Sequence, residues 1–375
     1  MIIDVIIPAY NCRNELIRCL HSTASQTYAK DIDVTIVDDA SDDELLSEHE
    51  LGECKTWFHN IKYIRLPENG GPGHARATGQ TTACGKYLTF IDADDTWATS
   101  YSIEKLVTVM ESNRNIDACF GKFIEETRNE KMYWVEHDND RVWMFGKMYR
   151  REFLEENNIV MNDSRSNEDM GFNQLVLACT DNVVWISDPI YYWHYKENSI
   201  TRRPENDYSF IGLKGYIYNH KWAFLECEKR GLNNTPKRHQ SIISAMCMMY
   251  LYHIESIETR TPEKNKELES WIQDFVNTCI GPYVERYDFN KQLIISILRD
   301  TDLYRNYLPS ITFEQWLKTL YNNYTQTLPD NTSNESINIV DNNNDDKINP
   351  YVSGNVTPDD NNESIHDVLN VSNNE

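Results

Sequence analysis

The sequence is poor in positive charge, and this limits the partners it can have. Its 375 residues contain 36 Lys and Arg against 59 Asp and Glu, a formal net charge of −23 at pH 7. Such a charge repels phosphate backbones unless basic residues gather on one face. A general nucleic-acid coating function is therefore disfavoured.

Long apolar runs are also missing. The longest uncharged run, residues 240–254, is shorter than the ~18–20 residues that span a bilayer. We expect a buried helix there, with Met246, Met248, Met249 and Tyr250 in its core. The opening MIIDVIIPAYN has no basic head or cleavage site, so we expect a first strand and not a secretion signal.

The cysteines do not suit zinc binding or a disulfide framework. There are nine, an odd number, with no C-x-x-C pair and no Cys/His spacing of zinc type. This favours reduced thiols used as small apolar side chains, and hence a cytoplasmic protein.

What the sequence does contain predicts about two folded units and a tail. From residue 1 to about 125, short β-rich runs such as DVTIVDD and KYLTFID alternate with helical patterns, as in a mainly parallel α/β sheet. Aromatic-rich segments over 126–204 predict a mixed continuation of that sheet. A 3.6-residue period over 205–330 predicts a helical domain.

Residues 331–375 predict a disordered tail. They contain 13 Asn, nine acidic residues and a single aromatic, so they cannot bury enough apolar surface to offset chain entropy. Without the −8 of this tail, the folded part still carries −15.

The strongest local signal is YLTFIDADDTW, a strand that ends in Asp92, Asp94 and Asp95. Three carboxylates this close repel one another unless a cation or hydrogen bonds compensate them. Carboxylates suit Mg²⁺ or Mn²⁺ that bridges substrate phosphates. The structural alternative is an acidic turn or helix cap after a strand.

Four blocks in the first 97 residues resemble the nucleotide-sugar half of family 2 glycosyltransferases. They are IIPAYNCRNELIRCLHSTASQTY, IVDDASDDE, ENGGPGHARATG and GKYLTFIDADD. Further blocks, WMFGKMYRREFLE, SNEDMGFNQLVL and PIYYWHYKENSITR, resemble the acceptor half (98–204) of bacterial enzymes that transfer sugars to surface polysaccharides or teichoic-type polymers. The resemblance implies a GT-A fold, a Rossmann-like nucleotide-diphospho-sugar transferase domain over 1–204.

The resemblance also implies the residues that bind the donor. Those expected around the nucleotide and diphosphate are Pro8, Ala9, Tyr10, Asp38, Asp39, Arg76, Asp92, Asp94 and Arg202. We place a uracil contact on Asp39, because a carboxylate accepts the imide N–H of uracil, which cytosine lacks. The alternative for Asp38 and Asp39 is a strand-end cap. Ala77 departs from the Asn that the family usually has after its arginine.

For the metal, the resemblance implies Asp94 and Asp95, with Asp92 nearer the ribose and His194 as a further metal or phosphate contact. A histidine beside aromatics is, alternatively, a packed side chain. Lys147 is expected either to contact an anionic acceptor or to be solvated.

For catalysis, the resemblance implies Asp169 as the base that deprotonates the acceptor hydroxyl, with Glu168 orienting it. An acidic pair at a helix start is also common without catalysis.

We therefore expect an inverting, Mn²⁺- or Mg²⁺-dependent transferase that moves a sugar from a UDP-sugar to a glycan or other hydroxyl, in the cytoplasm or at the inner face of a membrane. Two alternatives remain open: a catalytically silent nucleotide-sugar-binding or scaffold protein, and a transferase acting on hydroxymethylated DNA bases. The transferred sugar, the linkage and the oligomeric state are not predicted.

Overall fold

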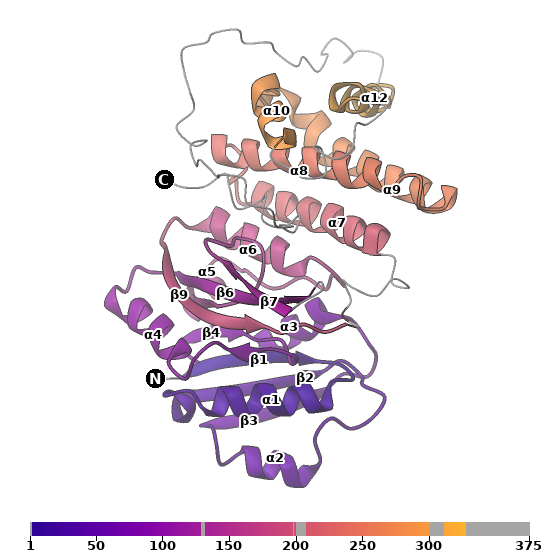
Figure 1. Cartoon of the computed structure of the whole chain (residues 1–375). Coiled ribbons are helices and arrows are strands. Elements are labelled where there is room, and N and C mark those ends of the chain that lie inside the picture. The colour runs from indigo at the N-terminus through magenta and orange to yellow at the C-terminus, as the bar shows by residue number, and fades with distance from the viewer. Residues whose placement is uncertain (1, 129–131, 198, 200–207, 300–310, 328–375) are drawn as a thin grey trace. The chain divides into compact units, whose positions relative to one another are not determined.

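The computed structural model describes residues 2–128, 132–197, 199, 208–299 and 311–327. The chain divides into two compact units, Met1–Ser199 and Ile200–Glu375 (Figure 1). No helix within these described ranges is long and apolar enough to cross a membrane. The predicted domain boundary after residue 204 and the predicted disordered tail lie outside the described residues.

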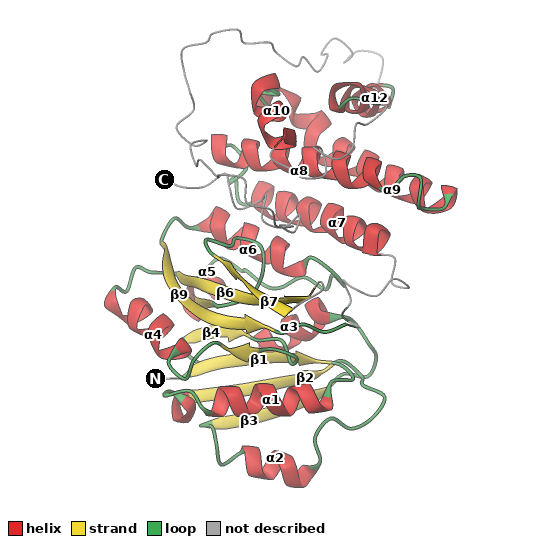
Figure 2. Ribbon diagram, in the orientation of Figure 1, coloured by secondary structure: helices red, strands yellow, loops and turns green. Residues whose placement is uncertain are grey.

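The first unit contains a curled sheet (Figure 2). It has nine strands in the order β3-β2-β1-β4-β8-β6-β9-β5, with β7 paired to β6. Its parallel part consists of β1 (Ile3–Ala9), β2 (Ile32–Asp38), β3 (Asn60–Arg65) and β4 (Tyr87–Phe90). Its mixed part consists of β5 (Thr96–Trp97), β6 (Ala118–Arg128), β7 (Met132–His137), β8 (Lys147–Arg150) and β9 (Val183–Trp193). The predicted α/β class and mixed continuation are confirmed.

Helices cover the sheet, which explains why β1, β2 and β4 are buried on both faces. The helices are α1 (Arg13–Ala24), α2 (Glu48–Cys54), α3 (Pro72–Thr81), α4 (Ser102–Ser112), α5 (Arg151–Glu156) and α6 (Glu168–Cys179). Val5 and Ile7 share a core with Leu16 of α1 and Leu106 of α4. Side chains alternate along a strand, so Ile6 faces the other way, against Gly79 of α3.

The strand order places a topological switch point between β1 and β4. The chain runs outward from β1 through β2 to β3 and then returns to β4 on the other side of β1. Helices leave the two strands in opposite directions at such a switch point, and ligands of open α/β sheets bind there, at the carboxyl ends of the strands. Ala9 and the Asp92–Asp95 segment lie at these ends.

The second unit is helical in its described part, as predicted for 205–330. It contains α7 (Tyr208–Lys229), α8 (Pro236–Glu255), α9 (Pro262–Phe275), α10 (Lys291–Arg299) and α12 (Phe313–Thr325), with a π-helical turn at Val276–Ile280 and a 3₁₀ turn at Gly281–Arg286.

Local signals set the helix starts in this unit. Thr235 and Thr261 cap α8 and α9 by accepting the backbone N–H of Arg238 and Lys264, and each threonine is followed by a proline. The core predicted for α8 is confirmed, because Met246, Met248, Met249 and Tyr250 are all buried.

Candidate active site

The three carboxylates after β4 have different surroundings. Asp95 is fully buried, whereas the side chains of Asp92 and Asp94 are 27% and 38% exposed. Burial and mutual repulsion raise the pKa of Asp94 and raise that of Asp95 further. The charged forms of these carboxylates are therefore disfavoured, and a cation bound beside them would stabilise them.

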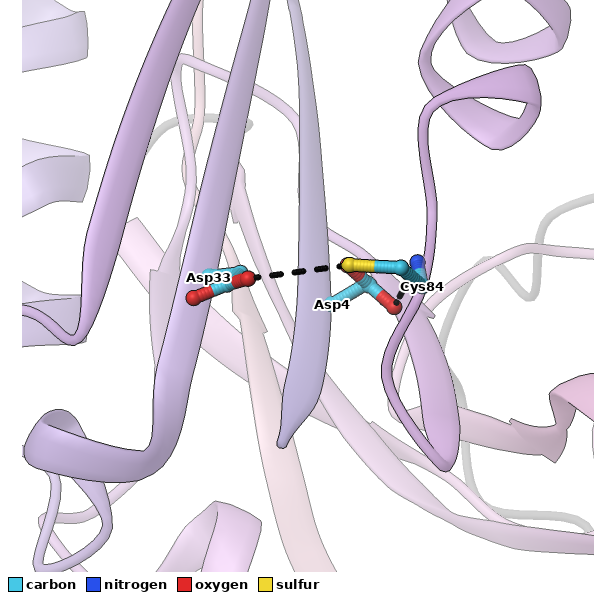
Figure 3. Close-up of side chains that lie close together, drawn as sticks. All are labelled: Asp4, Asp33 and Cys84. Carbon is cyan, nitrogen blue, oxygen red and sulfur yellow. Dashed lines mark hydrogen bonds between the residues drawn. The ribbon is translucent and has the colours of Figure 1, made fainter. Parts of the chain in front are cut away.

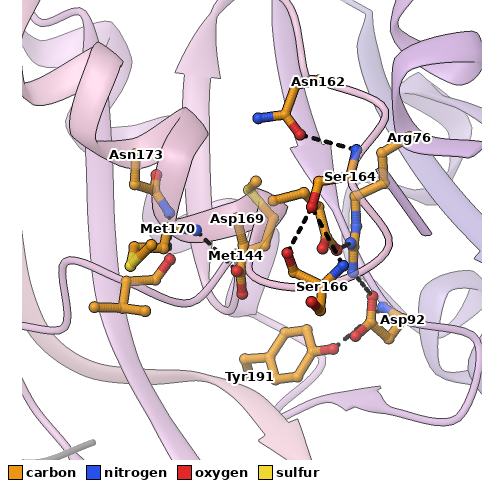
Figure 4. A network of polar contacts seen from close by, with 12 residues as sticks. Arg76, Asp92, Met144, Asn162, Ser164, Ser166, Asp169, Met170, Asn173 and Tyr191 are labelled. Atoms are coloured by element: carbon orange, nitrogen blue, oxygen red, sulfur yellow. Dashed lines mark hydrogen bonds and ion pairs between the residues drawn. The ribbon is translucent and has the colours of Figure 1, made fainter. Parts of the chain in front are cut away.

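Asp95 is held by β9. Its Oδ2 accepts the Tyr191 hydroxyl at 2.6 Å, and its Oδ1 accepts the His194 backbone N–H at 2.9 Å. The Tyr191 oxygen in turn accepts the Asp92 N–H at 3.1 Å (Figure 4). Asp95 thus links the carboxylate turn to β9, and the metal contact expected of it stays a prediction.

Arg76 joins the donor-side carboxylates to the start of α6. Its guanidinium, 5% exposed, donates to Asp92 through one nitrogen (Figure 4). It donates to Glu168 through another nitrogen. Burial opposes its charge, but Asp92 and Glu168 outweigh burial and raise the pKa of Arg76. In the structure Arg76 binds two carboxylates, and its predicted contact with nucleotide or diphosphate remains untested.

Asp169 follows Glu168 in the first turn of α6. Burial, with the neighbouring Glu168 carboxylate next in effect, raises the pKa of Asp169 to about 8, against the opposing effect of Arg76. Burial likewise raises the pKa of Glu168. A carboxylate with a pKa in this range accepts a proton far more readily than an ordinary Asp, as a general base requires.

The loop before α6 is fixed against α3. A Cβ on Gly73 would lie 2.4 Å from the Ser164 carbonyl oxygen and 2.5 Å from that of Asn162. Only glycine allows this approach. This close contact between Gly73 and the 162–164 loop keeps α3, which carries Arg76, next to α6, which carries Asp169. The two segments are about 90 residues apart in the sequence.

Asp38 and Asp39 hold their own loops. Asp38 is fully buried, and its oxygens accept the Ser41 N–H and the Tyr63 hydroxyl, which matches the structural alternative of a strand-end cap. Asp39 accepts the N–H groups of Gly70 and Gly71 at 2.8 and 2.7 Å. Nucleotide contacts by this pair stay predictions.

Tyr10 lies beside this loop, at the end of β1, and is 47% exposed. Its neighbours Pro8 and Ala9 are the last two residues of β1. Tyr10 thus offers an exposed aromatic ring at the carboxyl end of β1.

His194 has partners at both ring nitrogens. Nε2 lies 2.9 Å from the Thr96 hydroxyl and Nδ1 lies 3.2 Å from Glu126 Oε2. This matches the packed alternative better than the metal contact, which no observation tests. The arginine expected alongside it, Arg202, lies outside the described residues.

Sequence reasoning missed Lys196 and Arg18. The Lys196 ammonium lies 3.4 Å from Asp94 Oδ2, and the Arg18 guanidinium donates to the Asp94 carbonyl oxygen. Lys196 was detectable only as a basic residue inside the YYWHYKENSITR block. No sequence signal joins Arg18, on α1, to Asp94.

Both expectations for Lys147 are wrong. Its side chain is fully buried, and its ammonium donates to Asp140 at 2.6 Å. Burial lowers the pKa of Lys147, and Asp140 opposes this effect. The lysine neutralises an internal carboxylate and cannot reach an acceptor.

A second acidic cluster lies away from this edge. Asp4, Asp33 and Cys84 bring one candidate ligand atom each within 4.8 Å of one another (Figure 3). Asp4 and Asp33 are the second residues of β1 and β2, so at ~3.3 Å per residue Asp4 lies roughly 16 Å from Ala9. Asp4 accepts the N–H groups of Cys84 and Gly85, which explains the cluster as a cap of the turn before β4.

The chain is similar to known transferases in sequence. Residues 4–167 match the family model "Glycosyl transferase family 2". Glycosyltransferase GlyA of Streptococcus pneumoniae is 27% identical over 226 residues, which are 53% of this chain and 31% of GlyA. The uncharacterized glycosyltransferase EpsJ of Bacillus subtilis is 26% identical over 270 residues, 64% of this chain and 76% of EpsJ. The chain thus spans about a third of GlyA and three quarters of EpsJ.

Solved structures share the fold. Staphylococcus aureus TarS 1–349 in complex with UDP-GlcNAc has a TM-score of 0.60 at 18% identity, covering 87% of this chain and 92% of that one. The same protein in complex with UDP has a TM-score of 0.58. Similarity at this level of identity establishes the GT-A-like architecture.

Proposed function

We propose that this chain is an inverting glycosyltransferase that moves a sugar from a UDP-sugar to an acceptor hydroxyl, because residues 4–167 match the model of glycosyl transferase family 2. The observation that carries the proposal is the bridge through Arg76. It joins Asp92, on the donor side, to Glu168, whose neighbour Asp169 has the raised pKa of a base. Donor binding and deprotonation of the acceptor would then share one network.

We place the donor at the switch point between β1 and β4. The exposed Tyr10 ring is available to stack on the nucleobase of the donor, and Asp39 lies in the loop beside it. UDP as the nucleotide is supported by the TarS complexes with UDP and UDP-GlcNAc, whose fold this chain shares. Its sugar stays open, since hexoses differ by single hydroxyl orientations.

A divalent metal fits the donor set at this edge. Asp94 has a partly exposed carboxylate, and Asp92 a less exposed one, both hard oxygen ligands of the kind Mn²⁺ and Mg²⁺ prefer. When bound, such a metal neutralises the charge that develops on the departing diphosphate. We assign it first to Asp94, because Asp95 and His194 have protein partners at both of their polar side-chain atoms.

Asp169 performs the proton transfer in this proposal. It takes the proton of the acceptor hydroxyl as the oxygen attacks the anomeric carbon, while the bond to the diphosphate breaks. One displacement inverts the anomeric configuration. Arg76 keeps Glu168 charged and in place, and Glu168 in turn keeps the pKa of Asp169 high.

A thermal-shift panel of UDP, GDP, CDP and TDP, with and without Mn²⁺, tests the donor site. A ligand that binds only the folded state raises its apparent stability with concentration. We expect a UDP-selective, metal-dependent shift that disappears in Asp94→Ala. No shift with any nucleotide would rule out the transferase proposal, whereas a UDP shift without hydrolysis or transfer would favour a nucleotide-sugar-binding scaffold.

The pH dependence of kcat/KM tests the base. Asp169 must be unprotonated to act, and its pKa is raised to about 8, so kcat/KM should rise with pH and level off above about 8. Glu168→Gln removes a charge that raises this pKa and should move the midpoint down, on the order of one pH unit. An unmoved midpoint in that variant would assign the titration to another group.

A further inference from the structure

A cation of the protein itself stands where the donor's metal is expected. The Lys196 ammonium lies between two carboxylates, 3.3 Å from Glu15 Oε1 of α1 and 3.4 Å from Asp94 Oδ2. Asp94 is the most exposed carboxylate of the turn after β4. Lys196 therefore neutralises the carboxylate of this turn that is most accessible to an incoming ion.

The two ion pairs of Lys196, with Glu15 and Asp94, are long and partly exposed. Charge-assisted hydrogen bonds between ammonium and carboxylate are commonly about 2.7–2.9 Å, and both of these distances are longer. All three side chains are also about one-third exposed, at 31%, 34% and 38%. Ion pairs of this kind contribute little to stability, so a competing ligand can displace the ammonium at low cost.

The other cation at this point is differently held. Arg18 donates to the backbone carbonyl oxygen of Asp94, not to its carboxylate. It can stay in place when a metal binds the Asp94 side chain. Lys196 cannot remain, because its charge would then lie within a few ångströms of a divalent ion.

We propose that Lys196 holds the metal position in the nucleotide-free protein and moves to the diphosphate when metal and nucleotide bind together. This inference rests on the proposed function. A metal arriving alone must displace the ammonium with no anion to receive it, whereas a metal arriving with a diphosphate supplies that anion. Lys196 thus makes the two ligands bind cooperatively, and the coupling is reciprocal by thermodynamic necessity.

Mn²⁺ binding, followed by electron paramagnetic resonance and calorimetry with and without UDP, tests this role. In Lys196→Met we expect Mn²⁺ alone to bind about 5-fold more tightly and UDP in saturating Mn²⁺ about 10-fold more weakly, within the usual range of coupling energies. Lys196→Arg should retain most of the coupling. Uridine binding should be unchanged, because uridine has no phosphate.

Lys105→Met is the matched control. Lys105 is 35% exposed and pairs with Asp188 at 2.6 Å, outside the proposed site. Lys105→Met removes the same charge as Lys196→Met. Equal changes in Mn²⁺ and UDP affinity in the two variants would therefore overturn the proposal, because they would follow from net charge alone. Unchanged Mn²⁺ and UDP affinities in Lys196→Met would also overturn it while leaving the transferase intact. Failure of the unmodified protein to bind UDP and Mn²⁺ would instead contradict the proposed function itself.

Discussion

Asp169→Asn is expected to lower the turnover number by about 10²–10⁴-fold, the usual contribution of a positioned general base. The amide keeps the shape of the side chain but cannot take the acceptor's proton. UDP affinity should change less than twofold, because the donor groups lie on β1, β4 and α3. Single-turnover transfer and calorimetric UDP binding, measured on the same preparation, check both parts.

The same variant should be more stable than the unmodified protein. In the folded state the pKa of Asp169 is raised from 3.8 to about 8, so the folded state binds the proton more tightly than the unfolded chain. Stability from this group is therefore full below the unfolded pKa and falls as the pH rises through the folded pKa. Asn removes this loss, which should raise the melting temperature by several degrees above pH 7.

Asp181→Asn is the control for Asp169, since Asp181 is exposed beyond the other end of α6. It should change neither turnover nor melting temperature. Retained turnover in Asp169→Asn would exclude Asp169 as the base. Loss of both turnover and stability would instead indicate that the carboxylate serves to hold α6.

Arg76→Met is expected to cost about 3–5 kcal/mol of unfolding free energy, the usual effect of removing one partner of a buried ion pair. The substitution leaves Glu168, itself buried, without its cation, and frees Asp92 to repel Asp94 and Asp95. Urea denaturation of the two proteins measures the difference. Turnover should fall as well, because the start of α6 loses its anchor.

A double variant separates charge from packing at Arg76. Arg76→Met combined with Glu168→Gln should recover part of the lost stability, because position 168 then no longer carries a buried charge without its cation. Arg13→Met is the surface control. Arg13 pairs with Glu50 at 2.5 Å but is 44% exposed, so its loss should cost less than about 1 kcal/mol. If Arg76→Met and Arg13→Met lowered the unfolding free energy equally, the buried bridge would contribute no more to stability than a surface ion pair.

The sequence predicted the place of the carboxylates better than their roles. An apolar run followed by Asp92, Asp94 and Asp95 was sufficient to place them at a strand end. Which of them is buried depends on Tyr191 and His194, about 100 residues later, and no local pattern carries that information. The roles are divided by tertiary contacts that only the folded chain creates.

Lys147 shows the same limit. A lysine at the start of a strand is indistinguishable in sequence from a solvated one, and its burial depends on Asp140 within a loop. The helical unit was easier to predict, because the 3.6-residue period of its apolar side chains is a local signal. Helices and strands could be predicted because neighbouring residues determine them. The chemistry of the site could not, because contacts between distant residues determine it.

The unequal burial of the nine cysteines makes chemical labelling informative. None of the nine forms a disulfide, and Cys84 is the one that is exposed. A maleimide dye on the native protein should attach chiefly there, before the start of β4 and remote from the carboxylates at its other end, and should leave the proposed donor site open.

The buried thiols are divided between the two units, with Cys12, Cys19, Cys54 and Cys119 in the first and Cys227, Cys247 and Cys279 in the second. They react only when the surrounding structure opens. Mass spectrometry of alkylated peptides during denaturation would therefore reveal which unit opens first, with no engineered probe.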